Sequence, residues 1–94
     1  MLKIIGNDVM QDGNKAGWIE TSRVFSADGK KIGYVTGSRI YDADGDKVGY
    51  IDGEYFYPQK GDDTRISLER MGEYVLGGDY PVEVRCAVYI LFRT

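Results

Sequence analysis

The sequence predicts a mainly β protein of the α+β class, in which an antiparallel meander precedes a C-terminal helical segment. Two kinds of dipeptide recur every 16 residues, Asp-Gly and Gly-aromatic, and the composition changes after residue 64. The Asp-Gly pairs are Asp12-Gly13, Asp28-Gly29 and Asp44-Gly45. Asp-Gly is typical of two-residue hairpin turns, because both central positions of such a turn need positive φ. Three to four 16-residue hairpin repeats are therefore expected to form a curled or barrel-like sheet.

A second set of turns is expected midway between the Asp-Gly pairs. It comprises Glu20-Thr21, Thr36-Gly37 and Asp52-Gly53. Two strands of six residues and two turns of two residues then add up to the period of 16, and about six residues is a common strand length. The predicted strands lie near residues 6–11, 14–19, 22–27, 30–35, 38–43, 46–51 and 54–59, with an edge strand over residues 1–5.

This register predicts which side chains share a face of the sheet, because opposing residues point to the same side. One face carries the row Trp18, Arg23, Tyr34, Arg39, Tyr50 and Tyr55, beside a companion row Val9, Ala16, Phe25, Ile32, Tyr41, Val48 and Tyr57. The other face carries Gly17, Val24, Gly33, Ile40, Gly49 and Phe56. Glycine within a strand often marks the close approach of another group, so this second face is expected to be tightly packed on a strongly curled sheet.

The C-terminal third is predicted to be helical. Apolar residues follow a helical spacing after Ser67, which can serve as the N-cap, and Gly77-Gly78 is the expected end of that helix. The stretch 80–93 fits both a helix that begins after an Asp79 cap and an alternating strand, and we favour the helix. Such an apolar helix must be buried against the sheet or against a partner chain.

Length and composition indicate one domain, residues 1–94, with a β-repeat region over 1–61 and a C-terminal tail over 62–94. The net charge of −3 argues against a nucleic acid or an anionic membrane as partner. Cys86 is the single cysteine, so no intrachain disulfide can form, and we expect a cytoplasmic protein without a cofactor. The N-terminus lacks the pattern of a signal peptide.

The candidate binding residues are Trp18, Arg23, Tyr34, Arg39 and Tyr50, which alternate aromatic and guanidinium groups along one row. The favoured interpretation is structural, because an arginine over a tyrosine across two strands is a cation–π contact. The row can also extend into a subunit interface. Alternatively, it is a stacking platform for sugar rings or, less favoured because of the acidic balance, for bases.

The aspartates around the third Asp-Gly pair resemble a metal site. Asp42, Asp44 and Asp46 resemble part of a calcium loop, but Lys47 and Gly53 occupy the positions where an EF-hand has glycine and glutamate. We therefore expect an acidic hairpin turn and no metal.

The sequence contains no histidine, which removes the commonest general base. Cys86 is expected to be a buried, inert thiol. Glu69 and Glu73 lie four residues apart on the predicted helix, with Arg65 nearby, and we expect them to form surface ion pairs rather than an acid–base pair. The sequence thus predicts a protein that is not an enzyme.

The repeat resembles that of small bacterial β-flower proteins over roughly residues 8–57. The resemblance rests on Ile40-Tyr41-Asp42-Ala43-Asp44-Gly45 with Val48-Gly49-Tyr50, and on Val24-Phe25 with Asp28-Gly29 and Ile32-Gly33-Tyr34. It implies a repeated β-hairpin assembly of uncharacterised role, and it implies no catalytic residue. We therefore expect a non-enzymatic module that binds another protein or assembles with its own copies, and the alternative is a carbohydrate-binding module.

Overall fold

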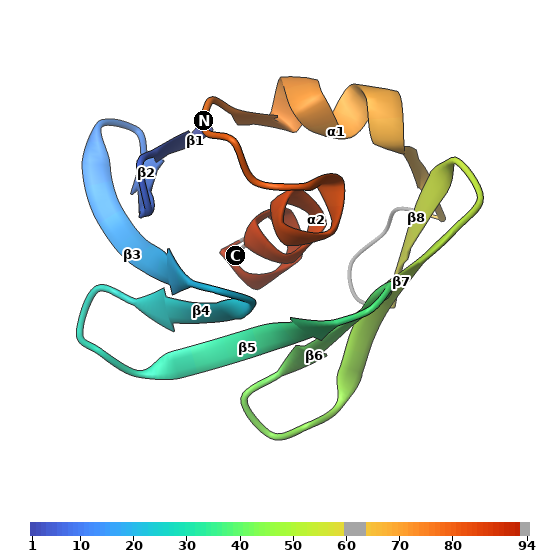
Figure 1. Cartoon of the computed structure of the whole chain (residues 1–94), viewed down its shortest axis with the longest axis horizontal. Helices are drawn as coiled ribbons and strands as arrows, with labels where there is room; N and C mark the ends of the chain where they lie inside the picture. The colour runs from blue at the N-terminus through green and yellow to red at the C-terminus, as the bar shows by residue number, and fades with distance from the viewer. Residues whose placement is uncertain (60–63, 93–94) are drawn as a thin grey trace.

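A computed structural model describes residues 1–59 and 64–92, in which a sheet of ten strands curls around a helix (Figure 1). Eight strands form an antiparallel meander: β1 (Leu2–Ile5), β2 (Asp8–Gln11), β3 (Asn14–Glu20), β4 (Arg23–Ser26), β5 (Lys31–Thr36), β6 (Arg39–Asp42), β7 (Lys47–Asp52) and β8 (Tyr55–Pro58). They are followed by β9 (Ile66–Ser67), α1 (Leu68–Tyr74), β10 (Val75–Leu76) and α2 (Val82–Leu91). The predicted fold class is therefore confirmed. The boundary predicted between residues 61 and 62 lies outside the described residues.

The Asp-Gly pairs all lie at chain reversals, as predicted, but two of the three loops are longer than expected. At Asp28-Gly29, the Ser26 N–H donates to the Lys30 carbonyl at 2.9 Å, and of the three loop residues 27–29 only the glycine has positive φ (92°). A type I turn closed by a left-handed glycine has this geometry. The loop at Asp44-Gly45 is closed in the same way, since the Asp42 N–H donates to the Asp46 carbonyl at 2.9 Å.

The second set of turns lies one residue further along the chain than predicted. The observed turns are Thr21-Ser22, Gly37-Ser38 and Gly53-Glu54, and their first residues have φ of 57°, 59° and 64°. The prediction placed glycine second, as in a type I′ turn, whereas the glycine is first, as in a type II′ turn. A turn displaced by one residue moves the register by two, so this displacement by itself does not move a side chain to the other face.

Bulges recur with the same 16-residue period. The pairing skips Ala16, Ile32 and Val48, each of which lies just before a strand glycine. A bulge bends a strand and increases its twist, so three equivalent bulges curl the sheet in a regular way. The prediction that Val9 and Val48 lie on the aromatic face is wrong, because Val9 is opposite Gly17 and both valines are buried in the core.

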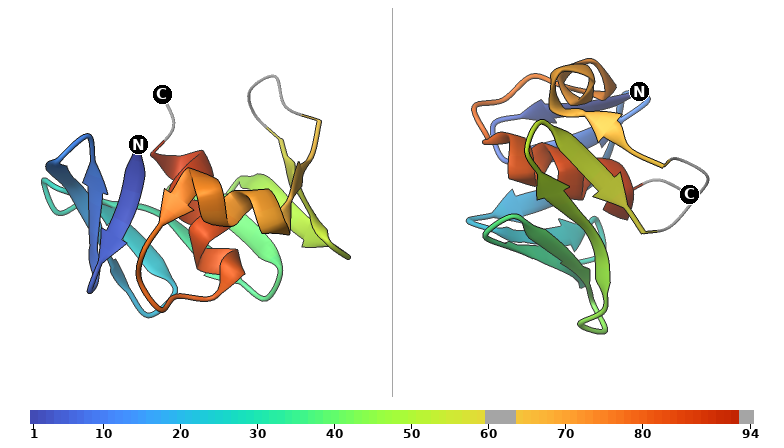
Figure 2. Two further views of the ribbon diagram at one scale, coloured as in Figure 1. Left: turned by 90° about the horizontal axis from the view of Figure 1, so that it is seen from above. Right: turned by 90° about the vertical axis from the view of Figure 1, so that its right-hand side faces the viewer.

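Helix α2 fills the inside of the curl (Figures 1 and 2). The helix predicted over 80–93 is thus confirmed over Val82–Leu91, and this part of the tail packs on the sheet. A Cβ added to Gly33 would lie 2.5 Å from Leu91 Cδ1 at the end of α2, which confirms that the glycine face is tightly packed. The core also takes Val84, Cys86, Ala87, Val88 and Ile90 from α2, and Ile4, Val9, Ile19, Val24, Ile40 and Phe56 from the sheet.

Helix α1 joins the two ends of the sheet. β9 pairs with β8 at one end and β10 pairs with β1 at the other, and α1 runs directly from β9 to β10. The predicted N-cap is confirmed, since the Ser67 hydroxyl accepts a hydrogen bond from the Arg70 N–H at 3.2 Å. We refer to β9, α1 and β10 together as the clasp.

Two predicted helix boundaries are wrong. Helix α1 ends at Tyr74 rather than at Gly77-Gly78, because Val75 and the next residue pair with β1. Helix α2 has Pro81 rather than Asp79 as its N-cap, without a side-chain bond. The Arg85 guanidinium holds the intervening loop, since it donates to the carbonyls of Val75 and Gly78 at 3.0 and 2.8 Å.

Candidate functional site: the outer face of the sheet

The outer face of the curled sheet carries three stacked aromatic pairs. The pairs are Trp18–Phe25, Tyr34–Tyr41 and Tyr50–Tyr57, with ring centroids 5.3, 5.1 and 5.1 Å apart and interplanar angles of 7°, 13° and 15°. Each pair joins two opposing residues of one hairpin, and all six side chains are half-buried. We call these six residues the aromatic ladder. Because stacked rings cover one face of each other, each ring keeps at most one face for a ligand.

A row of three lysines accompanies the ladder. Lys15, Lys31 and Lys47 place their Nζ atoms 5.5, 5.2 and 5.0 Å from the ring centroids of Trp18, Tyr34 and Tyr50. These separations lie within the range of cation–π contacts, which contribute about 0.5–1 kcal/mol each at exposed sites. We call these three residues the lysine row.

The sequence-predicted arginines lie where the register placed them, but the cation over each ring is a different one. Arg23 is opposite Tyr34 and Arg39 is opposite Tyr50. Within the described residues the cations over these tyrosines are lysines, so the expected Arg–Tyr cation–π contact is corrected to Lys–Tyr. The bulges explain the error, since each one brings a lysine to the same side of the sheet as the aromatic residue three positions further on.

The lysine row was missed, and the second ring of each pair was predicted on this face but not among the candidate binding residues. A recurring signal was available in the pattern Lys-x-Gly-aromatic, which appears at Lys15-Ala16-Gly17-Trp18, Lys31-Ile32-Gly33-Tyr34 and Lys47-Val48-Gly49-Tyr50. The residue between the lysine and the glycine, marked x in this pattern, is the one at the bulge. The bulge brings the lysine and the aromatic residue, three positions apart, to the same side of the sheet.

The outer face is basic although the chain is acidic overall. The outward side chains of β1 to β7 include six cations, Lys3, Lys15, Arg23, Lys31, Arg39 and Lys47, and three acids, Asp8, Glu20 and Asp52. Asp8 forms a salt bridge of 3.2 Å with Lys15. The whole chain has 12 cations and 15 acids, so the cations are concentrated on this face.

An apolar groove continues the outer face at β1 and β2. It has a volume of about 330 Å³ and is lined by Met1, Lys3, Ile5, Met10, Asp12 and Gly13. Met1 and Ile5 are 73% and 55% exposed, which is unusual for large apolar side chains. Met10 lies opposite Lys15, so the groove adjoins the first lysine of the row.

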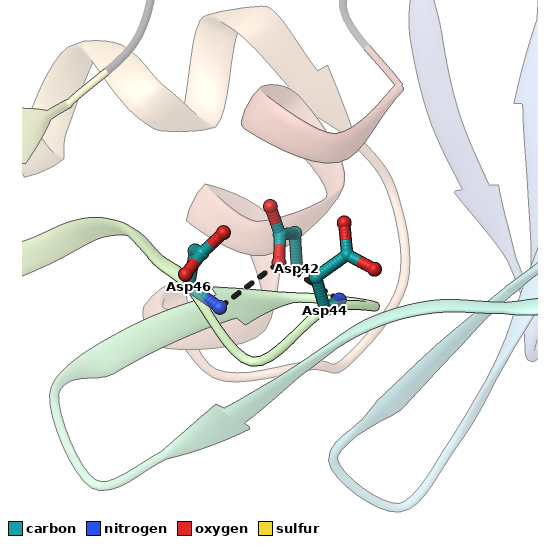
Figure 3. A group of neighbouring side chains, drawn as sticks. All are labelled: Asp42, Asp44 and Asp46. Carbon is teal, nitrogen blue, oxygen red and sulfur yellow. Dashed lines mark hydrogen bonds between the residues drawn. The ribbon is translucent and has the colours of Figure 1, made fainter.

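The three aspartates of the β6–β7 hairpin lie together at its turn (Figure 3). Their nearest carboxylate oxygens are within 4.8 Å of one another. Asp42 Oδ1 accepts the backbone N–H groups of Asp44 and Asp46, each at 3.0 Å. This pair of bonds holds the loop closed, which is an ordinary structural task for an aspartate at a turn.

The candidate catalytic residues are not brought into one site. Glu69 and Glu73 are both exposed on α1, while Arg65 lies 4.1 Å from the ring centroid of Tyr55. A pocket of about 320 Å³ is lined by Glu54, Tyr55, Ser67, Leu68 and Glu69. Glu73 is not part of its lining.

Cys86 is fully buried, as predicted. Burial, with a smaller contribution from the charge of Glu83, raises the pKa of its thiol to about 12. A thiol reacts through its thiolate, so this cysteine is inert near neutral pH.

No helix among residues 1–59 and 64–92 is long and apolar enough to cross a membrane. No curated protein and no solved structure matches the chain. A family model described as "4-fold beta flower protein" matches residues 6–70, which include the repeats, the aromatic ladder and the start of the clasp. Since this match spans more than half of the 94 residues, the chain belongs to the 4-fold beta flower family.

Proposed function

We propose that this β-repeat protein is a non-enzymatic protein-binding module, and that its outer face is the binding surface. The observation that carries the proposal is the regular array of three aromatic pairs, each with a lysine, on the side of the sheet away from α2. Tryptophan, tyrosine and arginine are the residues most enriched among those that dominate binding energy at protein interfaces. All three residue types are present on this face.

The other surfaces of the sheet offer less to a partner. The inner face is occupied by α2. The terminal strands β9 and β10 have two residues each and are joined by α1. Very short and covered edge strands are a common protection against edge-to-edge pairing, so we do not place the interaction there.

The stacking within the aromatic ladder favours a protein over a sugar. A sugar-binding platform uses the free faces of aromatic rings, and each ladder ring already shares one face with its partner. The edges and hydroxyl groups of stacked tyrosines suit a protein surface, where an amphipathic ring combines apolar area with a hydrogen-bonding tip. Carbohydrate binding stays the second candidate, and titration of Trp18 fluorescence with a glycan panel tests it.

Site-specific photo-crosslinking tests the protein-binding proposal. A benzophenone amino acid replaces Tyr34 or Tyr50 on the outer face, in cells that express the protein at its native level. The matched control carries the same amino acid at Tyr74, which lies on α1 and is 38% exposed. We expect adducts, with a partner protein or with a second copy, from the two outer positions and none from the control.

Adducts that form equally at Tyr74 would place the interaction elsewhere. The absence of adducts from both outer positions, with the protein folded and abundant, would refute the proposal. Sedimentation velocity on the purified chain then separates the two kinds of partner, because self-association makes the sedimentation coefficient increase with protein concentration.

A further inference from the structure

We infer that the outer face binds an extended acidic segment of a partner protein, which crosses the strands and anchors an apolar side chain in the groove at β1 and β2. This inference rests on the proposed function and adds the chemistry of the partner. It requires acidic residues at a defined spacing along the partner chain. Three features of the outer face lead to it: the unpaired lysines, their separation, and the adjoining groove.

The lysine row is suited to carboxylates. Lys31 and Lys47 are exposed, and neither forms an ion pair with any residue in the described ranges. The ring beneath each ammonium holds it in place on one side and leaves its other hydrogens for an acceptor. Lys15 already has Asp8 at 3.2 Å, so the free positive charge is concentrated at Lys31 and Lys47.

The separation of the lysines predicts the spacing of the acids. Equivalent residues of successive repeats are two strands apart, which is about 10 Å at a strand separation of about 4.8 Å. An extended chain of the polyproline II type has three residues per turn and rises about 3.1 Å per residue, so every third side chain points to the same side and residues three apart span about 9 Å. A segment that crosses the strands can therefore meet Lys15, Lys31 and Lys47 with every third side chain. The curvature of the sheet increases the separation of the lysines on its outer side. Acids two residues apart along the partner chain are therefore still too close together to meet successive lysines.

The groove supplies the anchor. Its most exposed wall is made of Met1 and Ile5, and it adjoins the Lys15 end of the row through Met10. A large aliphatic side chain of the partner, about three residues before its first acid, would cover this apolar surface. Apolar anchors of this kind commonly dominate the affinity of a peptide, while surrounding charges set its register.

An acidic peptide fits this face better than a single-stranded nucleic acid. Bases are bound mainly by stacking on free ring faces, whereas the ladder rings stack on each other. The net charge of −3 also opposes a nucleic-acid backbone, which carries one negative charge per nucleotide.

Peptide titration followed by Trp18 emission tests the inference, since Trp18 is the single tryptophan and lies in the ladder. The first probe is a ten-residue peptide with leucine at its first position and glutamate at the fourth, seventh and tenth, among glycine and serine. The second has the same composition with glutamate at every second position. We expect the first to bind at least fivefold more tightly, and to weaken as salt is raised.

Charge-reversal variants identify the lysines. The double variant Lys31→Glu/Lys47→Glu is expected to bind the first peptide at least tenfold more weakly. Lys31→Glu alone is compared with Lys30→Glu, the matched control that makes the same change in net charge at a neighbouring turn position that is not over a ring. We expect the control to retain binding within about twofold. Ile5→Ser should lower affinity only for the peptide with leucine, and not for one with glycine in its place.

Three results would overturn the inference: no saturable binding of the first peptide, equal affinity for both spacings, or tighter binding of a ten-nucleotide oligothymidylate. Equal losses from Lys31→Glu and from Lys30→Glu would also overturn it, because they would indicate a general charge effect. If the peptides fail while crosslinks form at Tyr34 and Tyr50, the acidic segment is refuted and the protein-binding function stands. Failure of both experiments removes the proposed function as well.

Discussion

Two Gly→Ala substitutions should change stability in opposite directions, because the same added methyl group meets different surroundings. At Gly33, on the inner face, a Cβ would lie 2.5 Å from both the Tyr41 carbonyl oxygen and Leu91 Cδ1. At Gly72, in α1, it would meet nothing within 4 Å. Neither glycine has positive φ, so the backbone conformation accepts alanine at both positions. The comparison therefore isolates crowding on the inner face, where the added methyl group meets both the neighbouring strand and α2.

The magnitude at Gly33 combines two opposing effects. Replacing a strand glycine lowers the entropy of the unfolded chain, which stabilises by about 0.5–1 kcal/mol. Overpacking costs about 1–3 kcal/mol. The Leu91 methyl group can rotate away, but the Tyr41 carbonyl belongs to the paired strand β6 and can yield only if the strands separate. We expect the free energy of unfolding to fall by about 2 kcal/mol, which corresponds to a decrease of about 8–16 °C in Tm for a domain of this size.

At Gly72 only the favourable effect operates. Alanine has a higher helix propensity than glycine by about 1 kcal/mol, which predicts a gain of about 4–8 °C in Tm. Gly17→Ala extends the series, since its Cβ would lie 1.9 Å from the Phe25 carbonyl oxygen, and it should be more destabilising than Gly33→Ala.

Thermal and urea unfolding, followed by circular dichroism, measure all three variants. If Gly33→Ala is as stable as the unmodified protein, Gly33 is not crowded by β6 and the end of α2, and the packing argument for the inner face fails. The order Gly17, Gly33, Gly72 from most to least destabilising is expected. A rank order unrelated to the distances would equally contradict the packing argument.

Three other outcomes are expected. Thr21 has a φ of 57°, which is strained for a β-branched residue, so Thr21→Gly should raise the free energy of unfolding by about 1 kcal/mol, and a lower urea midpoint would contradict this. Since burial raises the pKa of Cys86 to about 12, the folded protein should resist Ellman's reagent at pH 8, whereas prompt labelling of one thiol would show an accessible cysteine. The Ser26 hydroxyl, which donates to Asp28, lowers the pKa of that carboxyl. Any stabilisation from this bond is thus present above the unfolded-state pKa and is lost as pH falls through the folded-state value. Ser26→Ala should raise the pKa of Asp28 in an NMR titration, and an unchanged value would refute the assignment.

The repeat could be predicted from the sequence because its period is set by local chemistry. Each Asp-Gly pair and each strand of about six residues is a short-range signal, and the structure places all three pairs at reversals. The position of the second set of turns was harder to predict from the sequence. Thr36-Gly37 and Gly37-Ser38 are both acceptable turns, and only the type II′ geometry, with positive φ at the first residue, distinguishes them.

The clasp could not be predicted, because tertiary pairing overrides local preference there. Val75 follows a helical pattern from Ser67 onward, yet it leaves the helix to pair with Leu2 at the far end of the sheet. Nothing within the helical segment signals this long-range contact. The lysine row recurs in the sequence as Lys-x-Gly-aromatic, but its position beside the rings depends on bulges, and the bulge at Ile32 is visible only when Lys31 is found opposite Phe25.

The position of α2 limits where this chain can meet other molecules. In a half-buried antiparallel sheet one face is usually left to solvent, and here the curl brings the glycine face around Leu91 and Phe92 of the C-terminal segment. The clasp then joins the two ends of the sheet through strands of two residues. Both the inner face and the edges are thereby occupied by the chain itself. The 16-residue period places its rings and cations on the outer face. We therefore expect substitutions of the exposed lysines there to change binding more than stability, and substitutions on the glycine face to do the reverse.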